Sequence, residues 1–188
     1  LTMNSTDTQG AMDISIAFTD LAGNDGTDVS ATTNNSSVYY DRQVPTLSSV
    51  TAASNNSNTA YAKEGDIVTI SFTGAENLTS SPTVTIGGEA ATVSGTDDTW
   101  SATYTMQNGD TEGNVTFTVD FSDLAGNSGT QVTALTSGSL VVYDQSTPTL
   151  STVDITSSNV EASTLSTIGD IITLSITASE NIQSPTVT

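Results

Sequence analysis

Apolar and polar residues alternate along much of this chain with a period of two, which is typical of half-buried β-strands. Val68, Ile70 and Phe72 alternate with Thr and Ser, and the stretches 99–107 and 114–121 show the same pattern. No apolar pattern with the helical period is sustained along the chain. Clusters of Gly, Asn, Asp and Ser separate the alternating runs, so we predict strands joined by turns.

The pattern is repeated along the chain. FTDLAGNDGTDV and YYDRQVPTLSSV lie within 18–50, and FSDLAGNSGTQV and VYDQSTPTLSTV lie within 121–153. Pro45 and Pro148 set the period at 148 − 45 = 103 residues, and GDIVTISFTGAENL from Gly65 matches GDIITLSITASENI from Gly169. Solenoid repeats are much shorter, so this period predicts a tandem array of small domains that each have their own core.

The copies define three parts. Residues 1–43 match the end of a repeat, 44–146 form a complete repeat, and 147–188 match the beginning of the next. In the complete repeat we predict about seven strands, near 46–53, 66–73, 82–86, 89–94, 99–107, 114–121 and 130–143. This strand density is typical of immunoglobulin-like domains, so the predicted fold is all-β, with tandem Ig-like β-sandwich domains.

Neither partial repeat is expected to bury a two-sheet core by itself. Two explanations are open for the partial repeats at 1–43 and 147–188. In the first, the chain is a segment of a longer covalent array. In the second, chains join head to tail, and the two partial repeats rebuild one domain that lacks only the part equivalent to 86–103.

Composition narrows the range of functions. The chain carries 21 acidic residues against only Arg42 and Lys63, has a formal charge of −19, and contains no His or Cys. This balance argues against a nucleic-acid partner, because phosphate would find almost no cationic groups. Nucleophilic catalysis needs a base, and here only Lys63 or a carboxylate is available, so we predict that the protein is not an enzyme. No apolar run is long enough for membrane insertion in this segment.

Three motifs together resemble the bacterial Ig-like repeats of giant calcium-stiffened surface adhesins. They are the DLAGN turns, the GDIVTISF strand followed by an acidic EN turn, and the junction in which YD precedes PTL, and the resemblance covers the whole chain. It implies an extracellular extender or filament on the bacterial surface that holds a tip for cell adhesion, with calcium at the domain junctions. The junctions here carry VPT and TPT where many relatives have a second Asp or Ala, so the number of ligands stays open.

The predicted topology leads to a similar site. In an Ig-like sandwich, the loop after the second strand and the loop before the last strand lie at the end where the preceding domain enters. These loops carry Glu76, Asp123 and Asn127, and the entering linker carries Asp41. The equivalent positions in the neighbouring copies carry Asp20, Asn24, Asp144 and Glu180. With backbone carbonyls and water, such oxygens can provide the six to eight ligands of Ca²⁺, and the ion would stiffen the junction with the neighbouring repeat.

The same residues also favour turns without any metal, because Asp and Asn side chains bond to nearby backbone. The candidate carboxylates are the same in both copies, as Asp20 and Asp123, Asp41 and Asp144, and Glu76 and Glu180. Acids whose aligned partner is not acidic are predicted to be solvated surface, namely Asp13, Asp25, Asp28, Glu64 and Asp120. For Asp66 and Asp110 we predict turn capping, with a second calcium site as the alternative, and for Gly23 and Gly126 a positive φ.

A second class of function is a module that binds glycan or another cell-surface ligand. An exposed aromatic patch would favour it. Trp100, Tyr104 and Phe117 lie on the inward side of the alternation and are predicted to be core residues. The preferred interpretation is therefore the calcium-braced extender, whose partners are neighbouring repeats or chains of the same protein and whose tip ligand the sequence does not identify.

Overall fold

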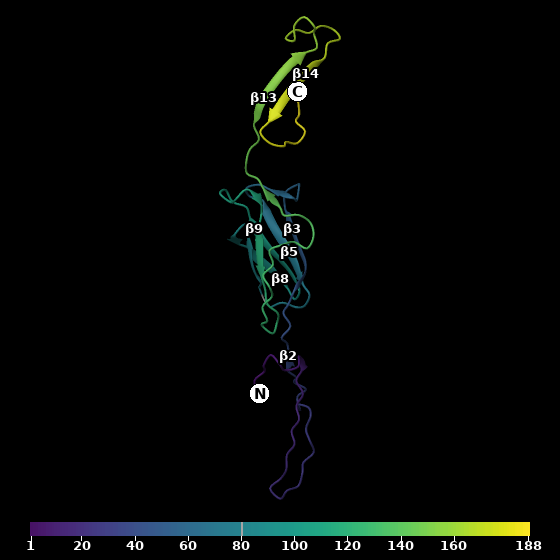
Figure 1. Cartoon of the computed structure of the whole chain (residues 1–188), viewed down its shortest axis with the longest axis vertical. Helices are drawn as coiled ribbons and strands as arrows, with labels where there is room; N and C mark the ends of the chain where they lie inside the picture. The colour runs from purple at the N-terminus through teal and green to yellow at the C-terminus, as the bar shows by residue number, and fades with distance from the viewer. Residues whose placement is uncertain (80) are drawn as a thin grey trace. The chain divides into compact units, whose positions relative to one another are not determined.

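The computed structural model describes residues 1–79 and 81–188. Within these residues the chain is all-β and contains no helix, which confirms the predicted class. The chain divides into two compact units, Leu1–Asp144 and Gln145–Thr188. Each unit is visible in Figure 1, with the second drawn in green to yellow.

The largest sheet has four antiparallel strands in the order β3-β5-β9-β8. These are β3 (Leu47–Ser54), β5 (Ile67–Gly74), β9 (Thr99–Thr105) and β8 (Thr92–Thr96). Val50 lies opposite Phe72, which in turn lies opposite Trp100. Along β5 every second residue is buried, as the alternation predicts.

Two smaller sheets contribute to the core within residues 44–144. One has the order β11-β6-β7, formed by β11 (Phe117–Asp120), β6 (Thr83–Ile86) and β7 (Glu89–Ala90). In the other, β12 (Val142–Tyr143) pairs antiparallel with β10 (Gly113–Asn114) and parallel with β4 (Tyr61–Ala62). The predicted strands at 46–53, 66–73, 82–86 and 99–107 match β3, β5, β6 and β9 closely, whereas 89–94 and 114–121 are each divided into two strands.

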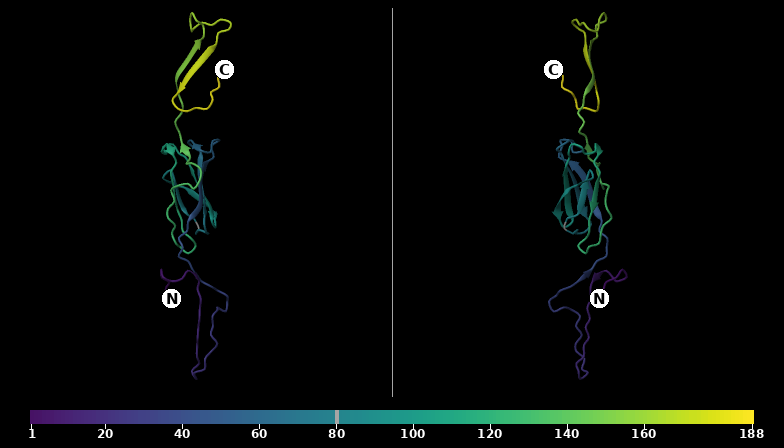
Figure 2. Two further views of the ribbon diagram at one scale, coloured as in Figure 1. Left: turned by 45° about the vertical axis from the view of Figure 1, so that its right-hand side comes forward. Right: turned by 90° about the vertical axis from the view of Figure 1, so that its left-hand side faces the viewer.

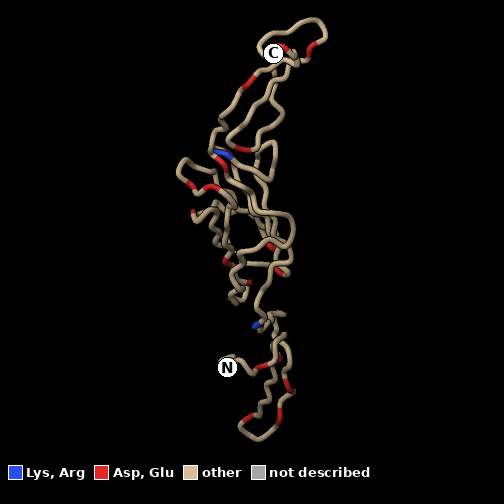
Figure 3. Tube along the Cα trace, turned by 45° about the horizontal axis from the view of Figure 1, so that its top comes forward, with Lys and Arg blue, Asp and Glu red and all other residues tan. Residues whose placement is uncertain are grey.

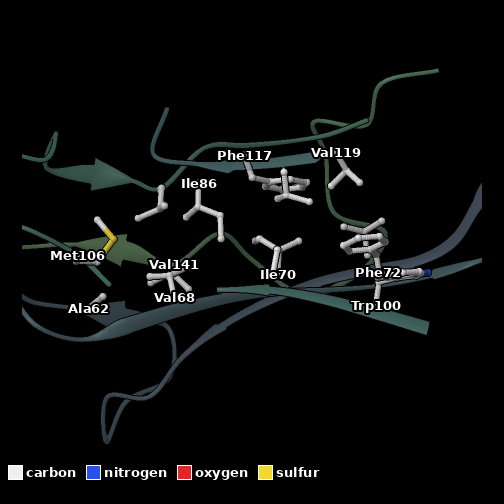
Figure 4. Close-up of a cluster of buried hydrophobic side chains, with 14 of the residues drawn as sticks. Ala62, Val68, Ile70, Phe72, Ile86, Trp100, Met106, Phe117, Val119 and Val141 are labelled. Carbon is white, nitrogen blue, oxygen red and sulfur yellow. The ribbon is translucent and has the colours of Figure 1, made fainter. Parts of the chain in front are cut away.

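Side chains from the four-stranded sheet and from β6 and β11 form one buried core. Figure 4 shows Phe117 and Val119 of β11 pointing toward Ile70 and Phe72 of β5. The Trp100 indole Nε1 donates to the carbonyl of Asp97 at 3.1 Å, so its polar edge is satisfied. Trp100 and Phe117 are therefore core residues as predicted, and Tyr104 is half-buried against the core.

The predicted strand at 130–143 is wrong over most of its length. Only Val142–Tyr143 is a strand, and Val132 forms an isolated bridge with Val119. Between them, the Thr136 hydroxyl accepts from Val50 N at 2.9 Å and donates to Val50 O at 3.1 Å. The Thr136 backbone N also donates to Val50 O at 3.0 Å, so this one residue bonds to β3 through both its side chain and its backbone, and Gly138 with φ 81° departs from the extended path.

The partial repeats contain short two-stranded sheets. In residues 1–43, β1 (Gly10–Ala11) pairs with β2 (Tyr39–Tyr40), and in the second unit β13 (Leu150–Ser157) pairs with β14 (Ile172–Ala178). Figure 2 shows the β13–β14 pair from two further directions. The repeat boundaries 43/44 and 146/147 stay predictions.

Candidate metal centre

Three carboxylates from distant parts of the sequence meet at one place in the first unit. Asp41 follows β2, Glu76 lies in the turn after β5, and Asp123 lies in the turn after β11. One carboxylate oxygen from each lies within 4.8 Å of the other two. This arrangement can hold a metal ion, and an all-oxygen donor set suits hard divalent cations. The sequence predicted these three acids as one group.

The DLAGN turn fixes the position of Asp123. Its Oδ1 accepts from Asn127 N at 2.8 Å and its Oδ2 accepts from Asn127 Nδ2 at 2.7 Å. Gly126 N donates to the Asp123 carbonyl at 3.2 Å, and Gly126 has φ 92°, a conformation that favours glycine. Asp123 is only 1% exposed, so this hydrogen bonding satisfies a buried charge.

Asn127 also connects the turn to the linker. Its Nδ2 donates to the carbonyl oxygen of Asp41 at 3.3 Å. The Asp41 Oδ1 in turn accepts from Gln43 N at 2.9 Å. Asn127 thus donates both to the Asp123 carboxylate and to the backbone of Asp41, which ties the DLAGN turn to the linker. Its role as a metal ligand stays a prediction.

Electrostatics at the group favour a cation. Burial, followed by the charges of Asp41 and Asp123, raises the pKa of the Glu76 carboxyl. Burial also acts to raise the pKa of Asp123, but the hydrogen bonds from Asn127 and neighbouring backbone outweigh it, so the pKa is lowered overall. Asp123 is therefore held ionised beside a carboxyl that resists ionisation, and a bound cation would relieve this conflict.

The two basic residues make their described interactions elsewhere. Figure 3 shows them in blue against the many acidic positions in red. The Arg42 guanidinium donates to the Ser5 carbonyl. The Lys63 charge helps to lower the pKa of Asp66, after the larger effects of hydrogen bonds from Asn56 and the Lys63 backbone.

Residues 1–43 contain a second DLAGN turn with the same local hydrogen bonding. Asp20 and Asn24 form the same turn, with Asn24 N to Asp20 Oδ1 at 2.8 Å and Asn24 Nδ2 to Asp20 Oδ2 at 2.8 Å, but both are exposed. These bonds lower the pKa of Asp20, first through the Asn24 side chain. Asp144 follows β12, and Glu180 follows β14 in the second unit. Within the described part of the chain, no second group of three carboxylates lies as close together.

The predicted turn caps are confirmed. Asp66 Oδ2 accepts from Lys63 N at 2.9 Å and from Asn56 Nδ2 at 2.7 Å, and Asp110 Oδ2 accepts from Gln107 N at 2.7 Å. The positive φ values predicted for the DLAGN glycines are also found, at 90° for Gly23 and 92° for Gly126.

Gly74 is a contributor that sequence reasoning missed. A Cβ at this position would lie 2.5 Å from the carbonyl oxygen of Glu76, so a side chain would push on the turn that carries this carboxylate. The aligned residue is Ala178. Comparison of the copies therefore gave no sign that glycine is required here. Only the short distance from a Cβ at position 74 to the Glu76 carbonyl indicates it.

No protein-family model, curated protein or solved structure matches this chain. In the described residues, there is no helix with the length and apolar character required to span a membrane.

Proposed function

We propose that this chain is an extender segment of a bacterial surface adhesin or extracellular filament, made of tandem Ig-like β-sandwich domains whose junctions bind calcium. One observation carries the proposal. Asp41 belongs to the end of one repeat, whereas Glu76 and Asp123 belong to the next, and their carboxylates converge within 4.8 Å. A cation held there would join two successive repeats.

The arrangement of the complete repeat supports an Ig-like sandwich. The four-stranded sheet contributes one set of buried side chains, and β6 and β11 contribute another to the same core. The turns carrying Glu76 and Asp123 meet beside the entering linker, as the Ig-like topology predicts. The repeated sequence extends this architecture to the partial copies.

Calcium fits the donors better than other common ions. The group offers carboxylate oxygens, the chain contains no His or Cys, and Ca²⁺ accepts irregular sets of six to eight oxygens that include carbonyls and water. Mg²⁺ requires near-ideal octahedral geometry at shorter distances. The ion would replace repulsion among three acids with attraction and would restrict rotation about the linker at Asp41.

The mechanical role follows from this restriction. A charge of −19 makes successive repeats repel one another, which keeps an array extended, and a cation at each junction would limit bending. Of the three aromatic side chains Trp100, Tyr104 and Phe117, which could form a glycan-binding patch if exposed, Trp100 and Phe117 belong to the core and Tyr104 is half-buried against it. Their burial favours the extender over the glycan-binding module.

The test is thermal unfolding of the chain in calcium and in excess chelator, followed by the fluorescence of Trp100, the single tryptophan, together with small-angle scattering. Calcium at 100 times its dissociation constant should add about 2.7 kcal/mol to the free energy of unfolding. Asp41→Asn should remove most of this gain, whereas Asp28→Asn, in the same segment but outside the acidic group, should retain it. Equal midpoints and scattering in calcium and chelator would overturn the proposal.

A further inference from the structure

The sheet β3-β5-β9-β8 has two edge strands, and the rest of the complete repeat covers only one of them. Along the β3 edge, the segment that follows β11 supplies hydrogen bonds to Val50. The Thr136 hydroxyl accepts from Val50 N at 2.9 Å, and Thr136 N donates to Val50 O at 3.0 Å. Beyond β8, the described residues provide no further strand of this sheet. The edge of β8 is therefore open.

An open edge strand presents a row of backbone N–H and C=O groups, because alternate residues of an antiparallel strand direct these groups away from the neighbouring strand. Proteins commonly protect such edges with charged side chains, proline or a β-bulge. The sequence of β8 is TVSGT, which contains no charge and no proline, and its register with β9 runs without a shift from Thr92 to Thr96. This strand thus lacks the features that prevent pairing with another chain.

The sheet that ends in β8 is uncharged in an otherwise acidic chain. None of its four strands contains a charged residue, although the chain carries 21 acidic residues and a formal charge of −19. On its outer side, Ser94 lies opposite Ser101, which in turn lies opposite Ser71, and the hydroxyl oxygens of Ser94 and Ser101 are 3.1 Å apart. A second acidic chain therefore meets less repulsion at this strand than at the charged turns.

Gly95 allows β8 to pack closely on β9. A Cβ at this position would lie 2.4 Å from the carbonyl oxygen of Thr99 and 2.7 Å from Cα of Trp100, and Gly95 has φ 146°, which favours glycine. The half-buried Val93 also packs against the core. Since the strand is already fixed on the sheet, it would lose little conformational freedom when a second strand pairs with it.

We propose that β8 pairs with β8 of a second copy in an antiparallel, two-fold arrangement centred on Ser94, which joins two four-stranded sheets edge to edge. The same strand serves on both copies, so the association stops at a dimer. Ser94 lies opposite Ser94 of the second copy, and Thr92 lies opposite Thr96. Hydroxyl and β-branched side chains at opposed positions favour strand pairing. With five residues in each strand, the contact is small and the dimer is reversible.

Acidic residues border β8 on both sides, with Glu89 before it and Asp97 and Asp98 directly after it. In an antiparallel pair, the end of one strand that carries Asp97 lies beside the end of the other strand that Glu89 precedes. These charges oppose the contact, and dissolved salt screens repulsion between exposed charges. The dimer should therefore become tighter as the salt concentration rises.

The test places charges at the centre of the proposed contact. Like charges directly opposite each other weaken a strand pair, and opposite charges strengthen it. Ser94→Glu and Ser94→Lys should each dimerise less than the wild-type chain. Their 1:1 mixture should form heterodimers about fivefold more tightly than either variant forms homodimers. Dissociation constants are measured by sedimentation over a concentration series, in chelator, at low and high salt. The fluorescence of Trp100 verifies that each variant is folded.

Ser71 provides a matched control, because it is exposed in the same cross-strand row as Ser94 but belongs to the central strand β5. Ser71→Glu should associate like the wild-type chain. A second readout uses the absence of cysteine from the chain. Opposed residues of antiparallel strands have Cα atoms about 4.5–5.5 Å apart, which a disulfide can span. With oxidised glutathione, Ser94→Cys should form a linked dimer faster than Ser71→Cys.

A wild-type chain that stays monomeric at every concentration and salt level would overturn the proposal. Association that Ser94→Glu leaves unchanged, or that Ser71→Glu weakens equally, would also overturn it. So would a mixture of the Glu and Lys variants that binds no more tightly than each alone, or equal rates of cross-linking at positions 94 and 71. The contact uses no member of the acidic group and is measured in chelator, so this proposal and the calcium proposal fail independently.

Discussion

Replacing Glu76 with glutamine removes one of three negative charges from the acidic group while preserving the size of the side chain. The three carboxylates lie within 4.8 Å of one another. At this limit Coulomb's law gives about 0.9 kcal/mol of repulsion per pair in bulk water and about 3.5 kcal/mol at an effective dielectric constant of 20. Glu76 is half-buried, so the lower end applies. Glu76 belongs to two of these pairs, so without metal the variant should be about 2 kcal/mol more stable than the wild-type chain.

Calcium should reverse this order. The wild-type chain gains about 2.7 kcal/mol at 100 times the dissociation constant, while the variant has lost a charged ligand. In a repeat of this size, 1 kcal/mol corresponds to about 4–8 °C in melting midpoint. Glu76→Gln should therefore melt several degrees higher than the wild-type chain in chelator and lower in calcium. The control is Glu64→Gln, an exposed glutamate outside the group, which should leave both midpoints unchanged.

The pH dependence in chelator provides an independent check. The raised pKa of Glu76 means that the folded chain binds its proton more tightly than the unfolded chain does. Its contribution to stability therefore falls as pH rises from below the ordinary value of 4.5 through the raised value, and the variant lacks this fall. A variant that is destabilised equally in calcium and in chelator would refute the reasoning and would make Glu76 a turn residue.

Three further changes test other contacts, all followed by tryptophan fluorescence during urea unfolding. Gly129→Ala places a Cβ 2.3 Å from the Phe121 ring and should cost about 1–3 kcal/mol, and the loss should shrink in a Phe121→Leu background. Tyr143→Phe removes the donor to a backbone carbonyl and should cost about 1 kcal/mol, whereas Tyr40→Phe, outside the complete repeat, should have no effect on this transition. Asp123→Asn should be destabilising at neutral pH in chelator. The folded state lowers the pKa of Asp123, so the extra stability of the wild-type chain over the variant should vanish as pH falls through and below the ordinary value of 3.8. A difference in stability that persists below this pH would contradict the explanation.

The sequence alone was sufficient for most of the strands and for much of the core. The alternation of Val68, Ile70 and Phe72 is a local property, because a pleated strand directs successive side chains to opposite sides whatever it packs against. The DLAGN turn was equally local, since Asp123 and Asn127 bond within the same few residues. The internal repeat also indicated the position of each strand and turn within a complete repeat.

The tertiary structure decided which distant residues each strand and turn contacts. The segment 130–141 alternates weakly but makes only isolated contacts, with a bridge from Val132 to Val119 and hydrogen bonds from Thr136 to Val50. The donation from Asn127 Nδ2 to the Asp41 carbonyl and the convergence of the Asp41, Glu76 and Asp123 carboxylates depend on how separate loops pack. Such contacts join residues far apart in the chain, so no local pattern carries them, and the geometry of the acidic group is set only when these loops come together.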